Sequence, residues 1–290
     1  MKKSRKLATL GICSALFLGL AACQQQHATS EGTNQRKSSS AKVPWKASYT
    51  NLNNQVSTEE VKSLLSAHLD PNSVDAFFNL VNDYNTIVGS TGLSGDFTSF
   101  THTEYDVEKI SHLWNQKKGD FVGTNCRINS YCLLKNSVTI PKLEKNDQLL
   151  FLDNDAIDKG KVFDSQDKEE FDILFSRVPT EATTDVKVHA EKMETFFSQF
   201  QFNEKARMLS VVLHDNLDGE YLFVGHVGVL VPADDGFLFV EKLTFEEPYQ
   251  AIKFASKEDC YKYLGTKYAD YTGEGLAKPF IMDNDKWVKL

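Results

Sequence analysis

The sequence predicts an α+β domain with a helical N-terminal lobe and a C-terminal antiparallel sheet. Apolar residues recur at helical spacing up to about residue 200, and from residue 208 the apolar period changes to two. Turn-forming stretches separate the alternating segments. Helices followed by neighbouring antiparallel strands are typical of α+β folds. We therefore expect a single α+β domain over residues 42–290.

Residues 1–22 have the order of an export signal. A basic start over residues 2–6 precedes an apolar run over residues 7–20, and small residues then lead to Cys23. The run is shorter than the about 20 residues that a membrane-spanning helix needs. This segment closely resembles the signal peptides of bacterial lipoproteins, and the resemblance implies that Cys23 carries the lipid (palmitate) and anchors the chain to the extracellular face of the bacterial cell membrane. An ordinary signal peptide that ends near a cysteine is the alternative.

The segment after the cleavage site is predicted to be a flexible tether. Residues 23–41 are rich in Gln, Ser, Lys and Thr and contain almost no apolar side chain. Such a segment cannot bury enough apolar surface to fold. The folded domain is therefore expected to start near residue 42.

Four helices are predicted in the N-terminal lobe. A capping-box pattern at residues 57–60 begins the first, and Asp70 begins the second. The third runs from about Asp106 to a glycine stop, and Thr124 or Asn125 caps a fourth. Two further helices with acidic surfaces are expected over residues 164–175 and 185–200.

The C-terminal half is predicted to be mainly sheet. Expected strands cover residues 208–213, 221–231, 237–243 and 250–255, with turns at residues 216–219 and 232–236. Ser256 is expected to cap a short helix, and residues 280–290 are expected to form a final hairpin. The domain order is therefore helices first and an antiparallel sheet second.

Charge and cysteine use narrow the class of protein. The formal net charge is -8, which argues against nucleic acid as a partner because phosphates bind basic surfaces. After removal of the signal and lipidation of Cys23, the chain keeps Cys126, Cys132 and Cys260. An odd number of cysteines is unlike a disulfide scaffold, so at least one thiol is expected to be free, with a Cys132–Cys260 bridge as an open alternative.

No metal or cofactor is expected. The histidines are scattered, and the sequence has no phosphate-binding glycine loop. The acidic run at residues 153–158 lacks the glycine and the bidentate glutamate of a calcium loop.

Three residues could form a catalytic set. Cys126 is expected at the start of a helix, where unpaired N–H groups and the helix dipole stabilise a thiolate and could hold an oxyanion. Asn125 and Arg127 could support that site. His226 lies on a predicted strand between glycines and is the candidate base, and Glu241 on the next strand is the candidate for orienting its ring.

The pairing of the histidine with the acid depends on strand register. With an even-numbered loop between their strands, His226 and Glu241 face the same side of the sheet. The five-residue turn at residues 232–236 is odd, so the pairing requires a bulge, which Gly236 could supply, or a shifted strand end.

A cysteine at a helix start followed by a strand histidine and an acid resembles the papain-fold amidases and peptidases of bacterial cell walls. The residues that carry the resemblance are Cys126, the stretch His226-Val227-Gly228 and Glu241. It implies a papain-like fold and a thiol hydrolase that cleaves amide bonds, with cell-wall peptide as a candidate substrate. A non-catalytic surface binding or adhesion lipoprotein with the same fold is the alternative.

The mature chain also resembles a family of surface lipoproteins of Gram-positive bacteria that is described only as a domain of unknown function. Three segments carry this resemblance, at residues 81–85, 124–129 and 225–230. It implies a location and no activity.

Overall fold

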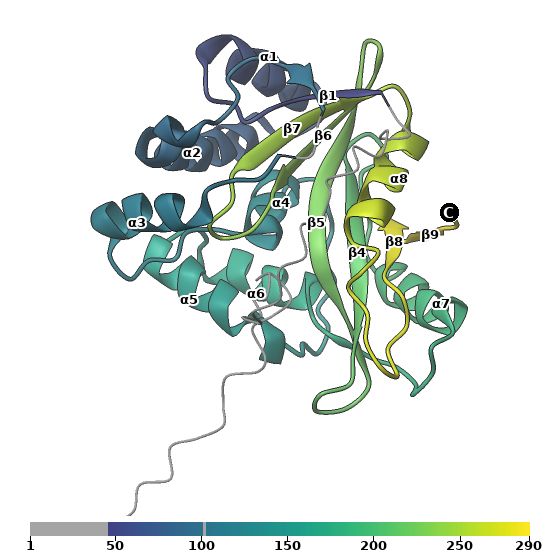
Figure 1. The fold of residues 1–290 in the computed structure, drawn as a ribbon. Coiled ribbons are helices and arrows are strands. Elements are labelled where there is room, and N and C mark those ends of the chain that lie inside the picture. Colours follow the sequence, from purple (N-terminus) through teal and green to yellow (C-terminus); the bar gives the residue numbers. More distant parts are fainter. Residues whose placement is uncertain (1–45, 101–102) are drawn as a thin grey trace, which may run out of the picture. The chain divides into compact units, whose positions relative to one another are not determined.

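A computed structural model describes residues 46–100 and 103–290, and these residues belong to one compact unit (Figure 1). The predicted signal peptide, Cys23 and the tether lie outside the described residues. Within the described ranges, no helix has the length and apolarity needed to cross a membrane.

The described residues form eight α-helices and nine β-strands. The helices are α1 (Gln55–Ser66), α2 (Pro71–Val88), α3 (Val107–Lys118), α4 (Cys126–Leu134), α5 (Phe151–Gly160), α6 (Ser165–Leu174), α7 (Val186–Phe197) and α8 (Lys257–Lys267). The strands are β1 (Ala47–Thr50), β2 (Thr98–Ser99), β3 (Val178–Pro179), β4 (Arg207–Asp215), β5 (Tyr221–Ala233), β6 (Gly236–Lys242), β7 (Tyr249–Phe254), β8 (Phe280–Asp283) and β9 (Lys286–Val288).

All nine strands belong to one antiparallel sheet, ordered β2-β1-β7-β6-β5-β4-β8-β9, with β3 paired to β5. The α+β prediction is confirmed. The expectation that the domain begins with helices is wrong, because β1 precedes α1 and pairs with β7. Its four residues, Ala-Ser-Tyr-Thr, show little apolar alternation, and their partner strand lies some 200 residues further along the chain.

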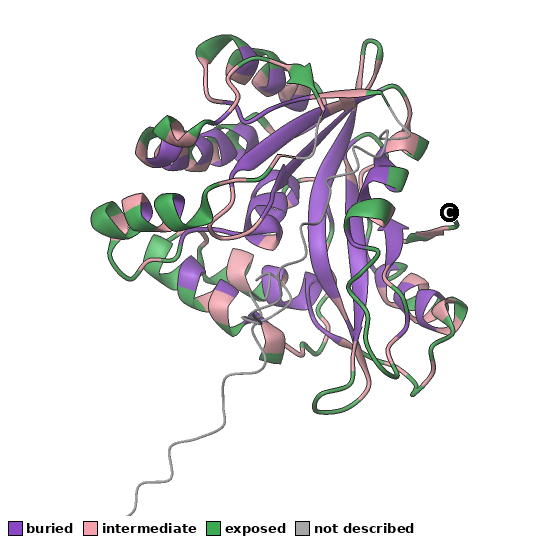
Figure 2. Cartoon of the chain, in the orientation of Figure 1, coloured by how far each residue is buried: buried purple, intermediate pink, exposed green. Residues whose placement is uncertain are grey.

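Most residues of the central strands β4 to β7 are buried (Figure 2). One face packs against α2, α4 and α7, and we call it the α4 face. The other packs against α8, and we call it the α8 face. Residues alternate between the faces along β6, with Val240 on the α4 face and Phe239 on the α8 face.

Polar side chains fix the helix starts. Asp70, Asp106 and Asn125 each accept a backbone N–H three residues ahead, as capping residues do. The first helix starts at Gln55 with Asn54 as its cap, two residues before the predicted capping box. The middle helices, the C-terminal helix and the final hairpin lie where the sequence predicts them.

Candidate active site

Cys126 is the first residue of α4, and Asn125 is its cap. The Asn125 side-chain oxygen accepts the Ile128 N–H at 3.1 Å, and its amide nitrogen donates to Asp153 at 2.7 Å. The N–H of Cys126 has no acceptor within the helix because it belongs to the first turn. Asn125 therefore fixes the helix start at which the sulfur lies.

Arg127 attaches the same helix start to the rest of the fold. Its guanidinium binds both carboxylate oxygens of Asp153, at 2.9 and 2.7 Å. Its third nitrogen donates to the Val224 carbonyl of β5 at 3.0 Å. Asp153 is buried, so a bidentate, hydrogen-bonded partner is what such a carboxylate requires. Asn125 and Arg127 thus position α4.

His226 and Glu241 meet because the turn between their strands is shorter than predicted. Ala233 pairs with Gly236, which leaves Asp234 and Asp235 as a two-residue loop. The loop has an even number of residues, so His226 and Glu241 face the same side of the sheet. Of the two conditions for this pairing, the shifted strand end is the one that holds. Gly236 supplies no bulge; its φ of 134° and its closeness to the Phe254 carbonyl demand a glycine in the turn.

The His226 imidazole and the Glu241 carboxylate form a buried, hydrogen-bonded pair on the α8 face. His226 Nε2 lies 2.5 Å from Glu241 Oε2. The other Glu241 oxygen accepts the Tyr263 hydroxyl and lies 3.4 Å from Lys267 Nζ. The His226 ring stacks on Tyr268 with centroids 4.9 Å apart. Glu241 is thus a buried carboxylate and not a surface one.

Electrostatics keep Glu241 ionised. Burial alone raises the pKa of a carboxyl group, but Lys267, the bond to His226 and the Tyr263 hydroxyl outweigh it and lower the pKa of Glu241 to about 2. The acid therefore carries a negative charge at neutral pH. A charged acceptor on Nε2 leaves Nδ1 of His226 to face the sulfur.

Cys126 approaches His226 where β5 and β6 separate. The two strands pair only from Val229 and Val240 outward to the turn, so the segment of β5 that holds His226 has no β6 partner. Helix α4 packs against both strands at this point. Cys126 belongs to the apolar cluster on the α4 face, whereas the His226 ring contacts Tyr268 and Glu241 on the α8 face.

The contact between the two groups shifts the pKa of the histidine. Burial lowers the pKa of His226, whereas the charge and hydrogen bond of Cys126 and the contact with Glu241 raise it, and the net shift is upward. This direction favours the imidazolium form of His226. The structure therefore brings Cys126, His226 and Glu241 together.

The other two described thiols lie elsewhere. Cys132 and Cys260 are free and buried, Cys132 on the α4 face and Cys260 on the α8 face. The sheet separates them, so the alternative of a bridge between them is wrong. Burial raises the pKa of Cys132 to about 12 and that of Cys260 well above its usual range.

Sequence reasoning missed several residues of the site: Asp153, Lys242, Tyr263 and Lys267. A usable signal for Lys242 was its position beside Glu241 inside an otherwise apolar strand, because adjacent strand residues point to opposite faces and both faces are buried. Asp153 belongs to the acidic run considered for calcium. Among the described residues, no group of three or more His, Cys, Asp or Glu side chains could hold a metal ion.

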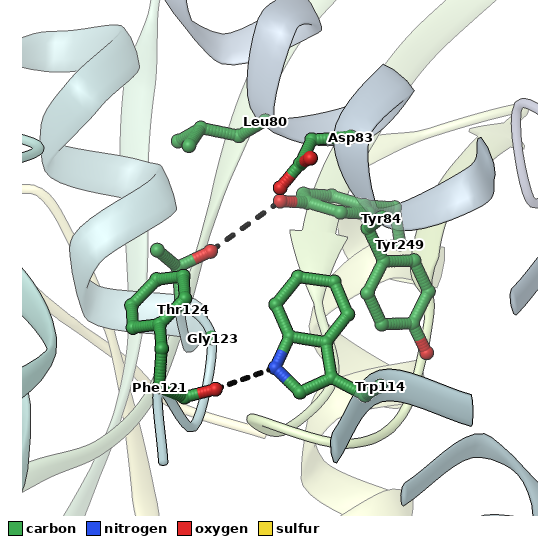
Figure 3. A pocket seen from close by; sticks show the side chains of 8 residues that line it. All are labelled: Leu80, Asp83, Tyr84, Trp114, Phe121, Gly123, Thr124 and Tyr249. Carbon is green, nitrogen blue, oxygen red and sulfur yellow. Dashed lines mark hydrogen bonds between the residues drawn. The ribbon is translucent and has the colours of Figure 1, made fainter. Parts of the chain in front are cut away.

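A small pocket opens beside the start of α4 (Figure 3). Tyr84, Trp114 and Tyr249 line it, together with Gly123 and Thr124, which precede Cys126 by three and two residues. Its volume of about 10 Å³ is close to the minimum that holds one water molecule. Cys126 itself does not line the pocket and is 0% exposed.

Comparison with known proteins places the chain in a family. The family model described as a domain of unknown function, DUF4300, matches residues 48–288. The chain belongs to the DUF4300 family. The match covers all elements of the candidate site in this DUF4300 domain. No curated protein and no solved structure matches the chain.

Proposed function

We propose that this DUF4300 protein is a lipid-anchored thiol hydrolase that cleaves amide bonds outside the cell. The single observation that carries the proposal is the contact of Cys126, at a helix start, with an imidazole whose far nitrogen is bound by a buried carboxylate. This order of groups resembles papain-fold enzymes, and the antiparallel sheet that follows the helix is consistent with such a fold.

The chemistry follows from the three groups. The Cys126 thiolate attacks the amide carbonyl carbon, and the first-turn N–H groups of α4 stabilise the oxyanion. The C–N bond breaks, the amine leaves with the proton of His226, and a thioester remains. Water then loses a proton to His226 and attacks the thioester, the C–S bond breaks, and a carboxylic acid and the thiol are released. Glu241 holds the ring throughout and stabilises its charge.

The location rests on the N-terminal sequence. We propose that lipidation of Cys23 tethers the domain to the outer face of the membrane, where peptides of the cell wall are the amide substrates nearest to it. Replacing Cys23 by Ala in the full chain is expected to abolish incorporation of a clickable palmitate analogue. Continued incorporation would contradict the anchor.

Hydrolysis is tested on short peptides released from Gram-positive cell wall, with products identified by mass spectrometry. The wild-type chain is expected to generate new amino groups, and Cys126→Ala and His226→Ala are expected to generate none. Cys132→Ala is the matched control and is expected to retain activity. Turnover that persists in Cys126→Ala would overturn the mechanism.

One observation favours a second function. Cys126, His226 and Glu241 are all buried, as they would be in a binding or adhesion module that keeps the fold without turnover. In that case the wild type and Cys126→Ala would bind cell-wall peptide equally and neither would cleave it.

A further inference from the structure

Lys242 is a buried amine next to the candidate site with no part in the catalytic set. It is the last residue of β6, and its side chain points to the α4 face, opposite to that of Glu241. Only 1% of it is exposed. A lysine this deeply buried is rare unless it is paired, so its partners show what it does.

The partners of Lys242 all belong to the loop between β6 and β7 (residues 243–248) or to aromatic rings. Its Nζ donates to the Thr244 carbonyl at 2.8 Å, to the Phe245 carbonyl at 3.2 Å and to the Glu247 carbonyl. Three acceptors match the three N–H groups of an ammonium ion. The Nζ also lies 4.2 Å from the ring centre of Tyr84, which favours a cation.

The β6–β7 loop lies against the start of α4 and the pocket beside it. The Phe245 carbonyl oxygen is 3.5 Å from where a Cβ would stand on Gly123. The Tyr84 hydroxyl, which lines the pocket, donates to the Glu246 carbonyl. Lys242 is close enough to Cys126 for Cys126 to raise the pKa of its amine. The loop and its lysine thus cover the approach to the sulfur from this side.

We propose that Lys242 is a positioning residue that controls access to Cys126: its ammonium group holds the β6–β7 loop against the residues before α4, and the loop leaves them when substrate enters. This inference rests on the proposed thiol chemistry for its meaning. It accounts for a nucleophile that is 0% exposed.

The hold of Lys242 on the loop depends on pH. The titratable groups around its amine are Glu246 and Glu247 of the loop, Cys126 of α4, and the hydroxyls of Tyr84 and Tyr249. Burial lowers the pKa of Lys242 to about 7, although the two glutamates and Cys126 raise it. Above that pH the neutral amine keeps only two N–H groups for three carbonyl oxygens, so the loop is held less firmly.

The test is alkylation of Cys126 by iodoacetamide in the full chain, measured for each cysteine by peptide mass mapping. At about pH 6, Lys242→Met is expected to raise the Cys126 rate at least about tenfold, because three buried carbonyls lose their donors and the loop moves out to water. Loss of a nearby positive charge would by itself slow a thiolate reaction, so a faster rate reports access. Lys253→Met on β7 is the matched control, since Lys253 pairs with Glu60 at the surface, and it is expected to change nothing.

The rate ratio of Lys242→Met to wild type is expected to shrink as pH rises past about 7, because the wild-type loop then loosens too. A purely structural role would leave the ratio constant. An unchanged Cys126 rate in Lys242→Met would overturn the proposal. Equal acceleration at Cys126, Cys132 and Cys260 would also overturn it, because Lys242 would then support the whole domain and not the loop.

Failure of this inference differs from failure of the proposed function. Alkylation reports access to the sulfur whether or not the protein hydrolyses anything. If Lys242→Met leaves the Cys126 alkylation rate unchanged while Cys126-dependent hydrolysis is intact, only the role of Lys242 in holding the loop is rejected. If Lys242→Met selectively accelerates alkylation of Cys126 but the protein hydrolyses no peptide, only the proposed reaction is rejected.

Discussion

The two ends of α4 each hold a buried cysteine, and the surroundings of the two sulfurs differ. Cys132, near the C-terminal end, packs in the apolar core with the Ser73 carbonyl 4.0 Å from its sulfur, and burial raises its pKa to about 12. Cys126, at the N-terminal end, faces an imidazole, a lysine and the positive end of the helix. Burial alone makes a thiol inert; what differs at Cys126 is the charge around it.

The largest expected effect is the difference in reactivity between these two sulfurs. In the folded wild type, iodoacetamide is expected to modify Cys126 about a thousandfold faster than Cys132, because a loop opens locally whereas the core of a helix opens only with the domain. Residue-resolved mass mapping measures both rates in one sample. Similar alkylation rates at Cys126 and Cys132 would contradict the expected difference between the two ends of α4.

Arg127 connects the N-terminal end of α4 to α5 and β5 through its bonds with Asp153 and the Val224 carbonyl. Arg127→Leu is expected to lower the free energy of unfolding by about 3–5 kcal/mol, because it leaves the carboxylate of Asp153 buried without its cation. Urea titration followed by circular dichroism measures the loss. Lys159→Met, which removes an exposed pair with Asp155, is the control and is expected to cost less than about 1 kcal/mol.

Under the proposed mechanism, Glu241 orients His226. Glu241→Gln is expected to reduce hydrolysis at least about a hundredfold, because an amide neither holds the imidazolium charge nor fixes the tautomer. Steady-state kinetics on the cell-wall peptide measures this. Glu258→Gln, on the exposed side of α8, is the matched change and is expected to leave the rate unaltered.

The lowered pKa of Glu241 predicts how the stability of the fold changes at acidic pH. The pKa of Glu241 is 4.5 in its ordinary state and about 2 in the fold, so between these values the unfolded chain binds more protons. The stability from Glu241 is therefore complete above about pH 4.5 and is lost as pH falls toward 2. Urea midpoints across this range should fall more steeply for wild type than for Glu241→Gln, and equal slopes would contradict the ionised pair.

The smallest effect is expected at the cap of α4. Asn125→Ala is expected to cost about 1 kcal/mol, since the Ile128 N–H loses its acceptor. Asp106→Ala removes the same kind of cap from α3. Both variants should lose similar stability in urea, but only Asn125→Ala should alter alkylation of Cys126.

Much of this architecture was predictable because its signals are local. Caps such as Asp70 and Asn125 mark helix starts, and alternation in β4 to β6 marks the sheet. The three residues chosen for chemistry are the three that meet. The pairing of His226 with Glu241 depended on the length of the β5–β6 turn, which the sequence analysis made three residues too long.

The rest of the site was hidden because its residues act across long sequence separations. Tyr263 and Lys267 reach Glu241 from α8, which packs on the same face of the sheet as Glu241. Asp153 reaches Arg127 from another helix. The sequence spacing of these residues does not indicate such contacts, because they form only when the helices pack on the sheet and on one another.

The strand β1 has a practical consequence. It pairs with β7 through four residues, Ala47 to Thr50, and separates β7 from solvent along that edge. A shortened chain that begins at α1 would expose a bare, apolar strand edge able to recruit another molecule. A recombinant chain with a shortened N-terminus should therefore keep every residue from Ala47 onward, because a chain that lacks β1 is expected to aggregate.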